Sequence, residues 1–321
     1  ALRTGAARAA LVAAAIAKER KRPAPVIQPT GLHWERHYWF RTNSFVEYID
    51  PIEIKQVFGP EETSRLASGE WIEPPPQAVN ELKEEIYVKL SPLTPEAPDW
   101  KTYRAWKLIA HLKANNNSNP LISLRQEVHS TRTIRDEINN NKQYEILIPD
   151  AIKAAEILES HELDSNSIDV NQKLKKINLL THVKGLFGLL IMLSLSIPTI
   201  VGSGIQSILA RYMAEKSDEG LDARTTYFFL AGMFSPVIFW PIISLVIIIV
   251  IEANILSILG ITLFISLMIG FYLSSLLFLM GYDIWSEYRQ RLQIDKFSKS
   301  FEGQNFESLI EKLNNQLVLL K

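Results

Sequence analysis

The chain has 321 residues, of which 47% are hydrophobic and 21% are charged, and its formal net charge is −1. It contains no cysteine, which excludes disulfide frameworks, thiolate metal sites and cysteine nucleophiles. The charged residues lie almost entirely up to Lys184 and from Asp283 onward. Because the interval between them carries long charge-free runs, we expect a soluble part and a membrane part, and no nucleic-acid partner.

The first segment predicts a helix followed by two strands. Residues 2–20, beginning at Leu2, are rich in alanine, which favours a helix, and small residues recur at helical spacing. Prolines end that helix, and Val26-Ile27 begins a short strand that Pro29 and Gly31 interrupt. A second strand, residues 44–49, is β-branched and aromatic.

Two histidines between these strands, His33 and His37, suggest a metal site because imidazoles four residues apart share one face of a helix. They lie in a connection between strands, however, and no third ligand accompanies them. We therefore predict no metal site and interpret the segment as an aromatic and charged loop.

Four segments of the chain resemble one family of enzymes. In order they are Gly5-Ala6-Ala7-Arg8-Ala9-Ala10-Leu11, then residues 25–32, then residues 47–54 with their Asp50-Pro51-Ile52 pattern, and Leu93-Thr94-Pro95-Glu96-Ala97-Pro98-Asp99-Trp100-Lys101-Thr102. The first three resemble the later part of the glycerolipid acyltransferase domain, as found in glycerol-3-phosphate and 1-acylglycerol-3-phosphate O-acyltransferases. The fourth is similar to a segment of the membrane-anchored fungal and bacterial-type branch.

This resemblance implies a fold and a reaction. It implies that residues 1–58 are the rear part of an α/β acyltransferase domain. It also implies transfer of a fatty acyl group from an acyl thioester, either acyl-CoA or acyl-carrier protein, to glycerol 3-phosphate or lysophosphatidate in phospholipid synthesis. No further cofactor is expected.

The family's catalytic pair is a histidine followed five residues later by aspartate, in which histidine acts as the general base. None of the six histidines has an aspartate at that offset, and no acceptor-phosphate motif precedes the membrane part. We therefore expect an N-terminally truncated chain with no catalytic residues of its own and with its catalytic motifs upstream. The principal alternative is a catalytically inactive membrane scaffold or anchor protein.

Substrate-binding candidates follow only from the resemblance, since the block at residues 25–32 borders the substrate cleft in the family. They are Pro29, Thr30 and Gly31; termination of a strand explains the same residues equally well. Arg3 and Arg8 face either an anionic acceptor or solvent.

The middle of the chain, residues 59–183, is polar and helical by pattern, interrupted by runs rich in proline and asparagine. It is either a helical linker to the membrane anchor or a regulatory insert that gates the acceptor. Residues 184–282 then form the membrane region, with charge-free segments at 185–210, 225–251 and 253–282.

The last two segments are long enough to span a bilayer and are joined by a short connection at Glu252, which predicts a two-helix transmembrane hairpin. Basic residues flank its outer ends, so these ends and the catalytic side are expected in the cytoplasm. The membrane would be a bacterial inner membrane or the endoplasmic reticulum. We interpret residues 185–210, which a proline and glycines break, as a re-entrant or interfacial segment.

The tail, residues 283–321, predicts an amphipathic cytoplasmic helix. Its apolar stripe is Phe306, Leu309, Ile310, Leu313, Leu317 and Leu320. That stripe has three possible partners: the catalytic domain, the lipid headgroups, or a second copy in a homo-oligomer.

Overall fold

The computed structural model describes residues 3–35, 42–216, 221–251 and 254–320. Leu2, His37 and Glu252, which the sequence analysis uses, lie outside these ranges. The chain divides into two compact units. Unit 1 comprises Ala1–Glu35, Asn43–Ala114 and Asn119–Ile152, and unit 2 comprises Arg36–Thr42, Asn115–Ser118 and Lys153–Lys321.

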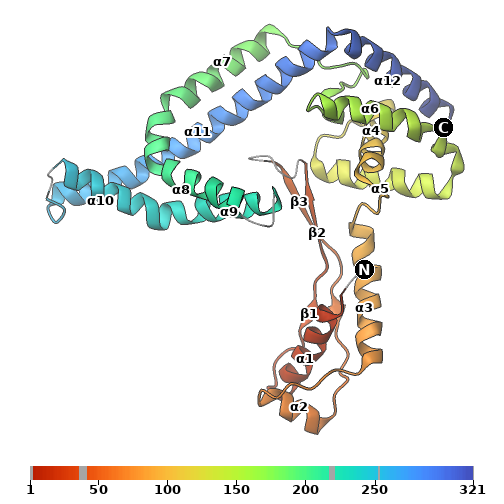
Figure 1. The fold of residues 1–321 in the computed structure, drawn as a ribbon, viewed down its shortest axis with the longest axis vertical. Helices are drawn as coiled ribbons and strands as arrows, with labels where there is room; N and C mark the ends of the chain where they lie inside the picture. The colour runs from red at the N-terminus through yellow and green to blue at the C-terminus, as the bar shows by residue number, and fades with distance from the viewer. Residues whose placement is uncertain (1–2, 36–41, 217–220, 252–253, 321) are drawn as a thin grey trace. The chain divides into compact units, whose positions relative to one another are not determined.

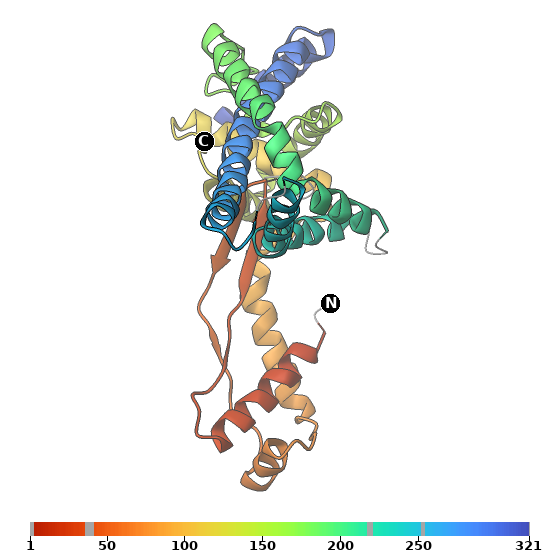
Figure 2. The same ribbon diagram turned by 90° about the vertical axis from the view of Figure 1, so that its left-hand side faces the viewer.

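Unit 1 begins with helix α1 (Gly5–Glu19), which packs on α2 (Pro60–Ala67) and α3 (Pro76–Leu90). Figure 2 shows α1 crossing α3. Alanines on α1 permit this close packing, because Ala14 and Ala15 are completely buried. The hydrophobic core between these helices includes Leu11, Ile52, Phe58, Leu66, Val79, Leu82 and Ile86.

Four short strands complete the N-terminal part of unit 1. Strand β1 (Val26–Ile27) pairs antiparallel with β4 (Ile52–Glu53), and β2 (Thr30–Trp34) pairs antiparallel with β3 (Ser44–Tyr48). The register of the second pair sets Gly31 opposite Glu47 and His33 opposite Phe45. Each sheet has only two strands.

The prediction of an α/β domain is therefore wrong. The described part of the chain is mainly helical, and its strands form two separate antiparallel pairs with no parallel sheet. The physical reason lies in the strands themselves. Proline separates β1 from β2, and large apolar side chains on the outer faces of β2 and β3, such as Leu32 and Tyr48, remain exposed with no layer packed on them.

The rest of unit 1 is helical. Helix α4 (Trp100–Asn116) and helix α5 (Leu124–Asn140) bury apolar residues, and the 3-10 segment η2 (Lys142–Leu147) follows them. Helix α6 (Ile148–Ser160) begins in unit 1 and continues into unit 2 from Lys153. Two ion pairs fasten α4 to α5: Lys107 with Glu127, and Lys113 with Glu137 at 2.5 Å. A further 3-10 turn, η1 (Ser91–Leu93), links α3 to the segment before α4.

Unit 2 holds the membrane helices. A 3-10 turn, η3 (Ser165–Ser167), precedes α7 (Leu179–Ser194) and α8 (Ser196–Lys216). Helix α9 (Leu221–Phe234), the π-helical turn η4 (Ser235–Phe239) and α10 (Trp240–Val250) follow. The chain ends in α11 (Ile258–Ser298) and α12 (Phe301–Leu319).

Two helical segments, Thr226–Val250 and Ile258–Ser298, are long and apolar enough to cross a membrane. This agrees with the two spanning helices expected from the sequence and marks the chain as membrane-associated. Helices α7 and α8 pass the same test only together, and they are bent by 65° at the break between them. The π-helical turn coincides with Pro236, where the missing N–H disrupts regular α-helical bonding.

Small residues let the membrane helices approach closely. Helix α7 lies along α11 (Figure 1), and a Cβ on Gly185 would come within 2.1 Å of the Tyr288 ring. Gly202 on α8 faces the ring of Phe271 on α11 in the same way, at 2.6 Å. Such contacts are the usual basis of helix association in lipid, where the surroundings are as apolar as the helices.

The amphipathic tail finds its partner inside unit 2. Helix α12 buries Phe306, Ile310, Leu313 and Leu317, and the Phe306 ring lies 5.8 Å from that of Phe297 on α11. Helix α11 itself continues without a break through residue 283 to Ser298.

Candidate functional site

A cluster of charged and imidazole side chains joins the β2–β3 hairpin to α5 within unit 1. Arg132 on α5 is its centre, with its Nη2 atom 2.8 Å from Glu47 Oε2 on β3. The contact is an ion pair by distance, and its angles are not those of an aligned hydrogen bond. Arg132 Nη2 also donates to the Leu93 carbonyl at 2.9 Å and lies 3.1 Å from His33 Nε2 on β2.

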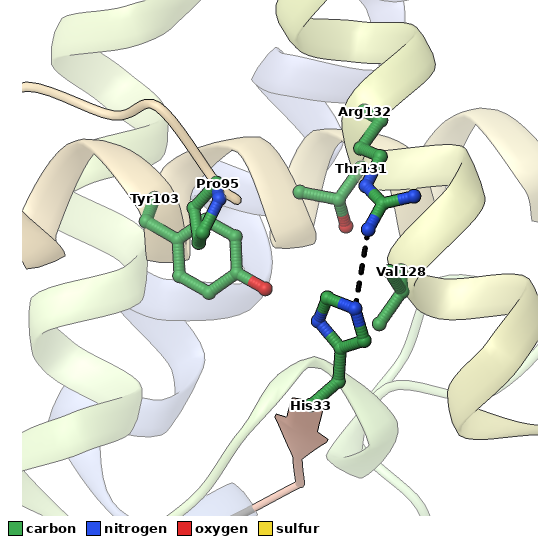
Figure 3. Close-up of a pocket in the computed structure, with 6 residues that line it drawn as sticks. All are labelled: His33, Pro95, Tyr103, Val128, Thr131 and Arg132. Carbon is green, nitrogen blue, oxygen red and sulfur yellow. Dashed lines mark hydrogen bonds between the residues drawn. The ribbon is translucent and has the colours of Figure 1, made fainter. Parts of the chain in front are cut away.

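These contacts define the state of His33. Figure 3 shows its imidazole directed at the Arg132 guanidinium, and because guanidinium nitrogens only donate, His33 Nε2 must accept. The proton of the neutral ring is then assigned to Nδ1. Burial lowers the pKa of His33 below its ordinary value and the charge of Arg132 lowers it further, against the opposing effect of Glu47.

Glu47 is ionised in the same cluster. Burial raises the pKa of its carboxyl group, but the adjacent Arg132 guanidinium, together with His129 and His33, outweighs burial and holds that pKa below its ordinary value. His129 Nε2 lies 4.0 Å from Glu47 Oε1, and its ring meets Phe45 edge-on at 5.9 Å. The cluster is thus a neutral histidine beside a tight cation–carboxylate pair.

The space enclosed beside His33 is small. Pro95, Tyr103, Thr131 and Arg132 line it with His33 (Figure 3), and its volume is about 10 Å³. Such a volume is near the lower limit for a single water molecule. Burial raises the pKa of the Tyr103 hydroxyl, which therefore stays protonated as a potential donor. The cavity does not accommodate a substrate, so the side chains around it fix the hairpin against α5 and hold its geometry.

Of the predicted substrate-binding residues, Gly31 lies beside this cluster. A Cβ on Gly31 would lie 2.9 Å from His33 Nε2 and 3.3 Å from Leu93 Cβ, so only glycine fits there without displacement. Pro29 is buried, and the Thr30 hydroxyl donates to the Gln28 carbonyl at 3.3 Å. Substrate binding by these three residues stays a prediction.

Other sequence candidates lie elsewhere. Arg8 pairs with Glu73 at 3.0 Å on the surface of unit 1, and Arg3 is exposed. His161 contacts Glu302 and His182 contacts Tyr288, both within unit 2. Among the described residues, no group of three or more potential ligands could hold a metal ion.

Sequence reasoning missed Arg132 and Glu47, the two residues that organise the site. One signal was available: Glu47 interrupts an otherwise apolar and aromatic strand, where a carboxylate needs a partner. Nothing local identifies that partner, because Arg132 lies on a helix with other charged residues.

Comparison with family models, with curated proteins and with solved structures finds no match to this chain.

Proposed function

We propose that this chain is the membrane-anchored part of an acyltransferase that transfers a fatty acyl group from acyl-CoA or acyl-carrier protein to glycerol 3-phosphate or lysophosphatidate. One observation carries the proposal. Two separate segments that resemble the glycerolipid acyltransferases, residues 47–54 and 93–102, meet at Arg132. Arg132 pairs with Glu47 of the first segment and donates to the Leu93 carbonyl of the second.

The membrane helices give this reaction a physical rationale. A fatty acyl chain and a glycerolipid product both partition into the bilayer, since each buried methylene contributes about 0.8 kcal/mol. An enzyme held at the membrane surface by Thr226–Val250 and Ile258–Ser298 shortens the transfer of both. We assign the ends of this hairpin, and the reaction, to the cytoplasmic side because the flanking residues are basic.

The reaction exchanges a thioester for an ester. The acceptor hydroxyl oxygen attacks the thioester carbonyl, a C–O bond forms, the C–S bond breaks, and the hydroxyl proton passes through a general base to the leaving thiolate. No histidine of this sequence has an aspartate five residues later, so the proposal assigns the base to residues outside these 321. The role proposed for Arg132, Glu47 and His33 is to hold the β2–β3 hairpin against α5.

The test is an assay of the complete gene product that carries these residues, in membranes, with radiolabelled glycerol 3-phosphate or lysophosphatidate and each acyl donor. Labelled lipid product is expected with at least one pair of substrates, and the 321-residue chain alone should give none. If the folded complete protein forms no product with any pair, the enzyme proposal fails and the inactive membrane scaffold takes its place.

A further inference from the structure

A polar cleft of about 460 Å³ opens on unit 1 beside the first turns of α5, and nothing proposed above uses it. This volume falls within the range of small-molecule sites in proteins. Apart from one leucine, the cleft is lined by six polar residues that we call the α5 cleft residues: Asn119, Ser123, Arg125, Gln126, His129 and Ser130. None of them is a carboxylate.

The hydrogen bonds around the cleft use side-chain oxygens as acceptors. Gln126 Oε1 accepts from the Ile122 N–H at 2.9 Å, so its amide nitrogen keeps both hydrogens available. Ser123 Oγ accepts from the Gln126 N–H at 3.3 Å as the N-cap of α5, so its hydroxyl hydrogen remains available as well. One acceptor position on each of these two side chains is therefore used within the protein, whereas their donors are not.

The charges around the cleft also favour a negatively charged ligand. The carboxylates of Glu127, Glu47 and Asp136 are paired with Lys107, Arg132 and Arg135 respectively, and Glu47 Oε1 also lies 4.0 Å from His129 Nε2. Arg125 is exposed, and within the described ranges it makes no ion pair. His129, also in the cleft, has half of its side chain exposed.

We propose that the α5 cleft binds a phosphate-type anion, with Arg125 as the principal cation and Ser123, Gln126, His129 and Ser130 as hydrogen-bond donors. A planar guanidinium recognises phosphate oxygens through two parallel hydrogen bonds. The anion belongs either to a soluble phosphorylated molecule or to the headgroup of a membrane lipid, because both present the same oxygens. This site does not depend on the acyltransferase proposal, since binding is measured without turnover.

The experiment uses the full chain in neutral detergent. Phosphorus NMR line broadening measures binding of inorganic phosphate at constant ionic strength, and native mass spectrometry counts adducts of phosphatidic acid against phosphatidylcholine. Wild-type protein should bind at least one phosphate probe. Arg125→Ala should weaken that binding by about ten- to a hundredfold, because hydrogen bonds to charged groups contribute on the order of 1.5–3 kcal/mol.

Two variants serve as controls. Arg125→Lys keeps the charge but loses the planar fork, so it should retain part of the affinity. Arg22→Ala removes the same charge from the exposed segment after α1 and should bind as wild type does. Binding of inorganic phosphate identifies a soluble ligand, and selective phosphatidic acid adducts identify a lipid headgroup. The proposal is overturned if neither probe binds, or if Arg125→Ala binds as well as Arg22→Ala.

Discussion

Replacement of Arg132 by methionine tests whether the buried cluster holds the β2–β3 hairpin in place. The substitution leaves Glu47 without its guanidinium partner and removes the donor to the Leu93 carbonyl. Breaking a fully buried ion pair costs about 3–5 kcal/mol. Here the side chains are 15% and 16% exposed, so solvent screens part of the loss and about 2–3 kcal/mol is expected. The hairpin should therefore open about thirty to a hundred and fifty times more often.

Hydrogen exchange measured by mass spectrometry on the full chain reports this local opening through peptides that cover β2 and β3. The control is Arg65→Met, which removes an exposed ion pair with Glu70 and should leave the hairpin unchanged. The double variant Arg132→Met/Glu47→Met should be protected better than Arg132→Met alone, because it leaves no unpaired buried charge. Simple addition of the two single effects would refute the assignment of Arg132 and Glu47 as a coupled pair.

Three further predictions concern pH, helix packing and topology. The pKa of His33 is depressed below 6.5, so the ring takes up a proton more readily when the hairpin is unfolded. Protection of β2 and β3 from hydrogen exchange, corrected for intrinsic rates, should therefore fall as pH drops below about 6.5, and His33→Gln should abolish this pH dependence. Gly185→Leu should separate α7 from α11 and lower the thermal midpoint in detergent by several degrees, whereas Gly232→Leu, which has open space, should not. Because the chain lacks cysteine, Leu256→Cys and Val170→Cys report sidedness cleanly: if α7 and α8 are re-entrant, an impermeant maleimide labels intact cells only at Leu256→Cys, and labelling at both positions would mean that they span.

Local features of the chain could be predicted because their signals are local. The alanine-rich run predicted a helix at residues 2–20, and α1 occupies Gly5–Glu19. The β-branched segment predicted a strand at residues 44–49, and β3 occupies Ser44–Tyr48. The charge-free runs predicted two spanning helices, and two helices of that character are present. In each case neighbouring residues decide the outcome through propensity or through the length needed to cross a bilayer.

The tertiary arrangement could not be predicted as well from the sequence, for a physical reason. A strand propensity states that a segment can pair, but it does not identify its partner, so the same short strands that predicted an α/β domain form two isolated antiparallel pairs. The stripe on α12 illustrates the same limit. Its apolar spacing predicted the helix and the face that is buried, but it was compatible with three partners. The structure shows Phe306 of this stripe packed against Phe297.

The Arg132 cluster was the hardest feature to predict from the sequence. Its partners Glu47, His33 and Leu93 come from three segments up to 99 residues away from Arg132. Ion pairs at the surface contribute little to stability and form in many combinations. A charge removed from water, in contrast, is strongly destabilised unless a charge of opposite sign lies beside it. A carboxylate in an apolar strand, such as Glu47, requires a cation, and a cation held there also fixes the tautomer of His33 and the position of Leu93. The resembling segments are held together by that requirement, which is why loss of Arg132 should loosen the hairpin and the 93–95 segment together.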